Sequence, residues 1–276
     1  MFQWAAVASQ FILDPPGRFD YSKKKSINHL LDPSTNSSGQ DPLDALYKEV
    51  LEGYFTDQET PLLFRSVLGQ LITSIEPLTI RSLTTLRQHV SHDRGDDGDA
   101  VVVLLRRLGP LLSNVNSSDE SLPIVPLHTS FRDFLTNKEK SGDFCVILRD
   151  SHRQLAHSCL GVLLKDLKFN ICKLESSYLA NKDVKDVNSR VDKYISPALL
   201  YACRFWDNHL EHIDFEIDLF GKLRTFFEEK FLFWLEVLSL TGNVRVASRA
   251  VSALNVWLAS GQSVSIIVGS TRKANN

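Results

Sequence analysis

The sequence predicts a mainly α-helical protein that contains one short β-hairpin. Apolar residues recur at intervals of three and four in successive segments, which is the pattern of helices with one buried face. Residues 111–128 differ, because they combine two short extended runs with polar turn residues, a pattern that indicates a hairpin. The chain has 276 residues and is 43% hydrophobic, so it can bury a sizeable core and should fold.

Residues 1–40 are expected to precede the compact body, in large part as a flexible linker. No Lys or Arg precedes the apolar run MFQWAAVASQFIL, so a secretory signal peptide is not expected. Residues 14–42 are rich in Pro, Ser, Asn, Asp and Lys, and they predict at most a short helix at SINHLL.

A first subdomain is expected over residues 41–137. Its helices are predicted in the segments DPLDALYKEVLEGYF, PLLFRSVLGQLITS, IRSLTTLRQHVS and DAVVVLLRRLGPLLS. Asp41 is available to cap the first helix, and the fourth should end near Pro110, which has no N–H to donate. LLSNV and SLPIVPLH then predict the two strands of the hairpin. Three helices followed by a hairpin is the layout of a winged helix, so a winged-helix subdomain is expected here.

An all-helical arm is expected over residues 138–260, followed by a tail at 261–276. Its helices are predicted in the segments SHRQLAHSCLGVLLKDL, SPALLYACRFWDNHLEHI, DLFGKLRTFFEEKFLFWLEVLSL and NVRVASRAVSALNVWLAS. The last helix should be capped by Asn243 and end near Gly261. Aromatic residues cluster in the last three segments, and at helical spacing they are expected to form a core between helices.

Charge and cysteine content exclude several classes of protein. With 31 basic and 33 acidic residues the net charge is -2, which provides no general field for nucleic acid or an acidic membrane. The apolar run FLFWLEVLSL contains Glu236 and is far shorter than the ~20 residues of a membrane-spanning helix. The four cysteines form no C-x-x-C pair, so a reduced, cytoplasmic protein without a membrane anchor is expected.

No common catalytic or metal-binding signature is present. The pair Gly221-Lys222 fails the pattern of a phosphate loop at two positions, since Glu216 replaces the first glycine and Leu223 follows the lysine. His89 with His92, and His209 with His212, have helical i, i+3 spacing. Two ligands do not make a zinc site, so both pairs are expected to lie on solvated helix faces and no metal is expected. A hydrolase built on a Cys and a His would have Cys159 as its most central candidate, but buried structural cysteine is the expected role.

A winged helix also raises the alternative of DNA binding. The recognition helix would be IRSLTTLRQHVS, with Arg81, Arg87, Gln88 and His89 as candidate contacts. The loop that follows carries Asp93, Asp96, Asp97 and Asp99, which would repel phosphate. Nucleic acid is therefore not the expected partner.

The stretch PLHTSFRDFL at residues 126–135 contains a short helix start. Ser130 is expected to cap this helix together with Asp133 three positions on. Phe131, Phe134 and Leu135 would form its apolar face. Packing then accounts for most of the stretch, and His128 is left without a structural role.

This stretch resembles the end of the winged-helix subdomain of NACHT-type signalling NTPases, in which a histidine precedes a small-Ser-Phe-polar-acidic-Phe-Leu pattern. Further blocks look like those of the large fungal members that usually continue into a WD-repeat propeller. In the same order, these blocks are LDALYKEVL, FRSVLGQLITSIEPLTIRSLTTL, LRRLGPLLS, ALLYACRFWDNHL and FLFWLEVLSL. The opening MFQWAAVASQFI looks like the last helix region of their NTPase module. The resemblance covers roughly residues 1–258.

The resemblance implies a molecular switch, with an ATP- or ADP-binding core, a winged helix that clamps the closed state, a helical arm and a sensor repeat domain. It places the winged-helix histidine at His128, which in relatives reaches the terminal phosphate of bound ADP. An imidazole N–H is a directional donor, so this contact can be gained or lost as the clamp moves.

The family's nucleotide machinery is missing from this chain, which has no phosphate loop, no acidic magnesium-binding strand and no propeller. We therefore expect a non-catalytic regulatory and interaction segment, with no cofactor in this chain alone, although ATP or ADP is implied for an intact family member. Its expected partners are proteins, among them the NTPase core of a full-length relative. The chain is either a piece of a longer product or a stand-alone protein that binds such a relative.

Overall fold

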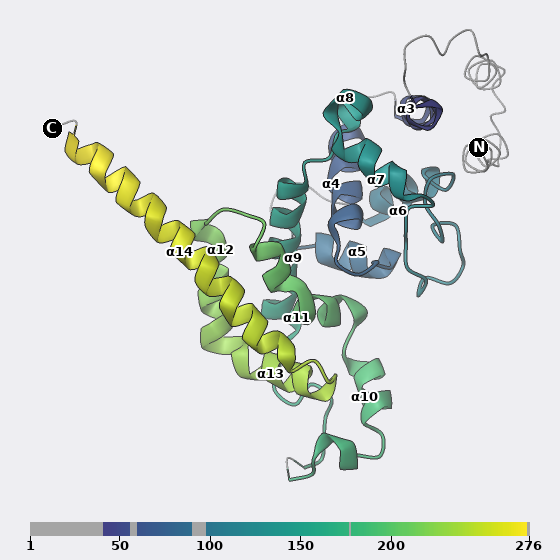
Figure 1. Ribbon diagram of the computed structural model, residues 1–276. Coiled ribbons are helices and arrows are strands. Elements are labelled where there is room, and N and C mark those ends of the chain that lie inside the picture. Colours follow the sequence, from purple (N-terminus) through teal and green to yellow (C-terminus); the bar gives the residue numbers. More distant parts are fainter. Residues whose placement is uncertain (1–40, 56–59, 90–97, 177, 275–276) are drawn as a thin grey trace, which may run out of the picture. The chain divides into compact units, whose positions relative to one another are not determined.

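The protein is mainly α-helical, as expected (Figure 1). The computed structural model describes residues 41–55, 60–89, 98–176 and 178–274. Within these ranges no named β-strand occurs. The linker expected over residues 1–40 and the acidic loop at 93–97 lie outside the described residues.

Two compact units make up the chain. Residues 1–81 and 96–151 belong to unit 1, and residues 82–95 and 152–276 belong to unit 2. Two of the points of division lie within helices, one in α5 (Ile80–Arg87) and one in α9 (Leu148–Asp166). Residues 138–151, which the sequence assigned to the helical arm, belong to unit 1, and residues 82–95, which it assigned to the first subdomain, belong to unit 2. None of the helices that the structure describes is long and apolar enough to cross a membrane.

Unit 1 is built from short helices. These are α3 (Pro42–Tyr54), α4 (Thr60–Thr73), α6 (Gly98–Arg107), α7 (Thr129–Thr136), α8 (Lys138–Ser141) and the 3-10 turn η2 (Gly142–Phe144). Helix α3 begins where the sequence predicted, because the Asp41 carboxylate accepts a hydrogen bond from the Leu43 amide at 3.0 Å and Pro42 occupies the first turn.

Aromatic side chains hold the helices of unit 1 together. The Tyr47 ring of α3 contacts Phe131 and Phe134 of α7, with ring centroids 5.0 and 5.4 Å apart. A second group joins Phe64 of α4 to Phe55 and Phe144. These rings are buried, which supplies much of the apolar area that stabilises so small a unit.

The expected β-hairpin is reduced to paired extended segments. The Ser113 amide donates to the Val125 carbonyl at 2.9 Å, and the Leu127 amide donates to the Leu111 carbonyl at 3.0 Å. An isolated antiparallel bridge joins Leu112 to Pro126, and another joins Thr79 to Pro123. The residues that pair lie within the two segments predicted as strands, but the predicted β-hairpin is not formed. No named strand forms in these described segments, because the two prolines have no N–H to continue a ladder.

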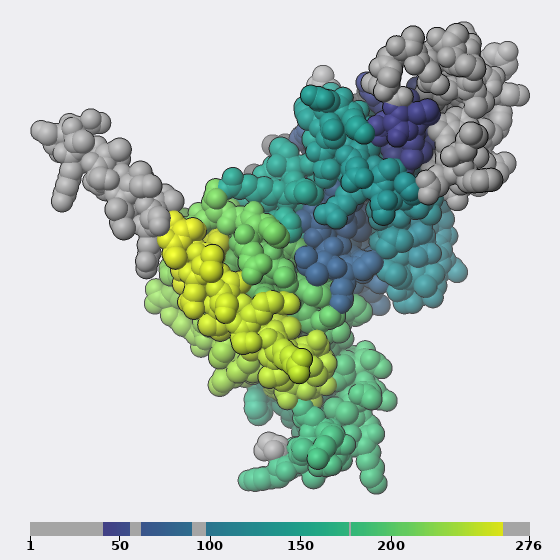
Figure 2. All heavy atoms as spheres, viewed as in Figure 1, coloured from purple at the N-terminus to yellow at the C-terminus, as the bar shows by residue number. Residues whose placement is uncertain are grey.

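Unit 2 contains helices that range from 8 to 30 residues in length. Besides most of α9, these are α10 (Val187–Tyr194), α11 (Pro197–Leu210), α12 (Ile217–Thr225), α13 (Phe231–Leu240) and α14 (Arg245–Ala274), with the short turns η3 (Asn181–Asp183) and π-helical η4 (Phe226–Lys230). Helix α10 was not predicted. In Figure 2 the yellow part of α14 lies against the green helices of this unit, in agreement with its contacts to α11 and α13.

Large aromatic residues fill the core of unit 2, as the sequence predicted. Trp206, Phe226 and Trp234 are buried, and their ring centroids lie 5.7 to 6.1 Å apart. The indole N–H of Trp234 donates to the Cys203 carbonyl at 2.9 Å, so its polar atom is satisfied inside the core.

The expected end of the last helix at Gly261 is wrong, because α14 continues to Ala274. Gly261 does not end the helix, and its lack of a side chain allows α14 to pack closely against Phe215. A Cβ atom at this position would lie 2.5 Å from ring atoms of Phe215. Asn243 was expected to cap α14, but its side-chain amide donates to the Thr241 carbonyl at 2.9 Å.

Candidate functional site

His128 occupies the N-cap of α7. Its Nδ1 accepts a hydrogen bond from the Ser130 amide at 3.2 Å, and the ring is half-buried. The capping box expected from Ser130 and Asp133 is therefore wrong. The helix begins at Thr129, so Ser130 is its second residue and donates its backbone N–H to the cap.

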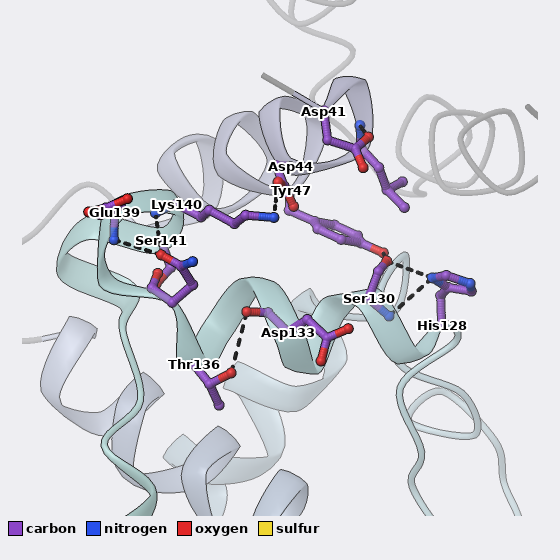
Figure 3. A network of polar contacts seen from close by, with 12 residues as sticks. Asp41, Asp44, Tyr47, His128, Ser130, Asp133, Thr136, Glu139, Lys140 and Ser141 are labelled. Carbon is purple, nitrogen blue, oxygen red and sulfur yellow. Dashed lines mark hydrogen bonds and ion pairs between the residues drawn. The ribbon is translucent and has the colours of Figure 1, made fainter. Parts of the chain in front are cut away.

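A chain of hydrogen bonds runs from His128 into the core of unit 1 (Figure 3). The Ser130 Oγ lies 2.6 Å from Nδ1 of His128 and 3.0 Å from the Tyr47 hydroxyl. Burial raises the pKa of the Tyr47 phenol, which therefore stays protonated and is available as a donor. The simplest proton arrangement has Tyr47 donating to Ser130 and Ser130 donating to His128.

This arrangement fixes the tautomer of the neutral histidine. An Nδ1 atom that accepts hydrogen bonds must carry a lone pair, so the ring proton lies on Nε2. Figure 3 shows that Nε2 faces away from Ser130. Among the described residues it has no hydrogen-bond partner, so it can donate to a group from outside.

An ion pair stabilises the same corner of unit 1. The Lys140 ammonium of α8 lies 2.7 Å from the Asp44 carboxylate of α3. Asn137 caps α8 by accepting from the Glu139 and Lys140 amides at 2.9 and 3.2 Å. Polar contacts thus join α3 to α7 and to α8 (Figure 3), and aromatic rings add to the contact between α3 and α7, which gives His128 a fixed position.

A groove of about 390 Å³ lies beside the start of α7. Its apolar wall comes from the end of α4 and the extended segment around Val125, and its rim includes Thr129, Arg132 and Asp133. Both charged side chains are exposed. Arg132 provides a positive charge one helical turn from His128.

His209 and His212 do not share a solvated helix face, contrary to the prediction. The His209 side chain is fully buried. Its Nε2 lies 2.8 Å from the Tyr201 hydroxyl and its Nδ1 lies 3.0 Å from Nδ1 of His152 on α9. Burial lowers the pKa of His209 to about 3, and the neighbouring His152 and His212 act in the same direction.

The segment ALLYACRFWDNHL already contained a sign of this burial, since α11 is apolar around most of its circumference. A histidine within such a helix is more often internal. Among the described residues, no group of three or more His, Cys, Asp or Glu side chains is arranged to hold a metal ion.

A second polar cluster of unit 2 had no sequence signal. The Lys222 ammonium of α12 lies 3.3 Å from Nδ1 of His157 on α9, and Nε2 of His157 lies 3.2 Å from Oε2 of Glu216. Oε1 of Glu216 lies 2.7 Å from Nε of Arg153. We call these four residues the lysine relay. Burial lowers the pKa of both Lys222 and His157.

The cysteines have no arrangement suited to nucleophilic catalysis. All four are free thiols, and Cys159, Cys172 and Cys203 are buried. Burial raises the pKa of the thiols of Cys159 and Cys203, so both remain protonated at neutral pH. Their structural role agrees with the sequence-based expectation.

The residues proposed for DNA contact are not all accessible. Arg87 is buried, with 5% of its surface exposed. Arg81 and Gln88 are exposed, and His89 is half-buried. A buried guanidinium cannot bind a phosphate, so Arg87 is removed from the four candidate contacts and Arg81 is the one arginine of this helix that stays exposed.

Chemically, the His128 corner presents a fixed Nε2–H donor and the cation of Arg132, which suits contact with an anionic oxygen. The lysine relay presents an amine next to an imidazole. No protein-family model, no curated protein and no solved structure matches the chain.

Proposed function

We propose that the chain is a non-catalytic regulatory and interaction segment of a NACHT-type signalling NTPase. In this proposal, residues 41–137 form a winged-helix subdomain that packs against a nucleotide-binding core held elsewhere, and residues 138–260 form the helical arm. The order of helices followed by two antiparallel bridged segments supports the winged-helix assignment. Protein partners are favoured over DNA because Arg87, one of the two arginines proposed to contact DNA, is buried.

The observation that carries the proposal is the hydrogen bonding of His128. A sensor of a terminal phosphate needs a neutral or charged donor that points at the phosphate oxygen. Because Nδ1 accepts the Ser130 amide at 3.2 Å, the neutral ring keeps its proton on Nε2. The donor is therefore available without any rearrangement of the ring.

The surroundings of His128 favour an anion. The positive end of the α7 dipole lies at this cap, and Arg132 adds a full positive charge on the exposed side of the same helix. Phe131 and Phe134 are buried against Tyr47, so movement of α7 would carry His128 with it as part of a rigid unit. A clamp needs this rigidity to lose or gain the phosphate contact in one step.

The test is the release of a fluorescent ADP analogue from the isolated NTPase module of a NACHT-type protein. Adding this chain should slow ADP release several-fold, and the chain by itself should not hydrolyse ATP. The His128→Asp variant should lose the effect, because aspartate can still cap α7 but repels a phosphate. His212→Ala, an exposed histidine of unit 2, serves as the matched control and should slow ADP release like the unmodified chain.

Three results would contradict the proposal. Hydrolysis of ATP by the purified chain would show that it is catalytic. If the chain leaves the rate of ADP release unchanged, it does not act as a clamp on the nucleotide-binding core. If His128→Asp slows ADP release as much as the unmodified chain does, His128 does not contact the phosphate.

A further inference from the structure

The lysine relay has a defined hydrogen-bond direction. A lysine ammonium can only donate, so Nδ1 of His157 is the acceptor in the 3.3 Å contact with Lys222. The ring proton then lies on Nε2 and is donated to Oε2 of Glu216 at 3.2 Å. Nε of Arg153 contacts the other oxygen of Glu216 at 2.7 Å and orients this carboxylate.

This is the arrangement of a base positioned to deprotonate an amine. His157 contacts the ammonium, and the carboxylate of Glu216 stabilises the imidazolium that forms when the proton is transferred. Lys222 and the His157 side chain are only partly exposed, which disfavours their charged forms and lowers the pKa of both groups. Lys222 remains accessible to a small reagent.

Other charges near the relay act in both directions. Asp218 on α12 favours the charged form of Lys222, whereas Lys222 and Arg153 disfavour the charged form of His157. His89, which lies against Gly161 of α9, experiences the charges of Lys165, Asp166 and Lys222. Among the described residues, Glu216 is the only carboxylate that is hydrogen-bonded to the His157 imidazole. A single anion therefore orients His157, which is the group that accepts the proton.

We infer that Lys222 is a modification site that accepts acyl groups from activated acyl donors, namely thioesters and acyl phosphates. Nδ1 of His157 takes a proton from the ammonium, and the neutral Nζ attacks the acyl carbon. An amide bond forms, the bond from the carbonyl carbon to sulfur or to the phosphate oxygen breaks, and the leaving group departs with the bonding electron pair. The second proton lost by the nitrogen passes to the leaving group, and His157 returns its own proton to solvent.

Three other lysines in the described ranges contact a carboxylate or a carbonyl oxygen. Lys140 is paired with Asp44 at 2.7 Å, which raises the pKa of its ammonium. Lys48 lies 3.9 Å from Glu52. Lys230 donates to the Leu167 carbonyl at 2.9 Å, which cannot act as a base at neutral pH. Lys222 differs because its bonded partner is an imidazole.

The test exposes the full chain to acetyl phosphate and, separately, to a small acetyl thioester at pH 7.5, and follows each lysine by quantitative peptide mass spectrometry. We expect Lys222 to be acetylated at least tenfold faster than Lys140, and several-fold faster than the exposed Lys168. Because all lysines react in the same tube, their ratio is independent of reagent concentration.

Two variants separate the relay from simple exposure. His157→Gln and Glu216→Gln should each lower the ratio of Lys222 to Lys168 acetylation several-fold, with the larger effect for His157→Gln. Glu211→Gln, an exposed residue on the same unit, is the control and should leave the ratio unchanged. Circular dichroism confirms that each variant is folded. A ratio near one in the unmodified protein, or a ratio that folded His157→Gln leaves unchanged, would overturn the inference.

Discussion

The guanidinium of Arg249 on α14 binds the carboxylate of Asp207 on α11, with Nε 2.7 Å from Oδ2 and Nη2 3.2 Å from Oδ1. The side chain of Asp207 has no exposed surface, whereas that of Arg249 is 42% exposed. A second contact joins Arg249 to the Arg204 carbonyl. This pair connects the two helices and gives the buried carboxylate a charged partner.

Replacing Arg249 with glutamine should lower the free energy of unfolding by about 2 kcal/mol, since the variant leaves a buried carboxylate without its charged partner. The figure is below that of a fully buried pair because water already reaches Arg249. Arg224→Gln is the matched control. Its pair with Glu228 is exposed on both sides and should cost at most about 0.5 kcal/mol. Urea unfolding measures both, and equal effects would contradict the role of Asp207.

Two helical glycines provide a test of close packing. A Cβ at Gly161 of α9 would lie 2.5 Å from the Cβ of His89, an atom that cannot rotate away, so Gly161→Ala should destabilise the protein by about 1–3 kcal/mol. Gly221 of α12 has nothing within 4 Å of the same position. Gly221→Ala should stabilise it by about 0.5–1 kcal/mol through helix propensity. Thermal unfolding distinguishes the two signs, and stabilisation by Gly161→Ala would show that α9 does not approach His89 this closely.

Helical periodicity predicted most of the fold because it depends only on neighbouring residues. Asp41 and Pro42 marked the start of α3, and the aromatic clusters that contain Trp206 and Trp234 marked helices that contribute to a common core. Gly261 shows the limit of such patterns. A glycine that stops a helix and a glycine that admits the Phe215 ring look identical in sequence, and only the tertiary contact separates them.

The candidate sites were less predictable, because they too depend on tertiary contacts that local sequence patterns do not show. His128 was singled out from its motif, but its role as a cap depends on where α7 begins. The lysine relay joins residues 153, 157, 216 and 222, and no local spacing relates α9 to α12. Contacts between helices that are distant in sequence cannot be recognised from the residue pattern of one sequence.

His209 should make stability depend on pH. Its pKa is about 3 in the folded protein and about 6.5 when unfolded, so between these values the unfolded chain binds the extra proton. Stability is therefore full above pH 6.5 and falls as the pH decreases toward 3, by at most about 1.4 kcal/mol per pH unit from this group. His157 and His89 also have lowered pKa values and contribute in the same direction.

Urea unfolding at pH 7.5 and at pH 5.0 measures this dependence. The midpoint should be lower at pH 5.0 for the unmodified protein, and the difference should shrink in His209→Gln, which cannot take up the proton. An identical pH dependence in a folded His209→Gln variant would show that His209 is not the buried group responsible.

The cap formed by His128 can be separated from its proposed contact with a phosphate. His128→Ala removes the acceptor for the Ser130 amide and should lower the free energy of unfolding by about 1 kcal/mol. His128→Asp restores an acceptor at the N-cap, with a charge that suits the positive end of the helix, and should remain within about 0.5 kcal/mol of the unmodified protein. Thr129→Ala, at an exposed neighbouring position that forms no cap, is the control and should have little effect. Urea unfolding of the three variants gives the order. If His128→Asp is as unstable as His128→Ala, the histidine stabilises α7 through its ring and not through the cap, and the fixed tautomer that leaves Nε2 as a donor loses its structural basis.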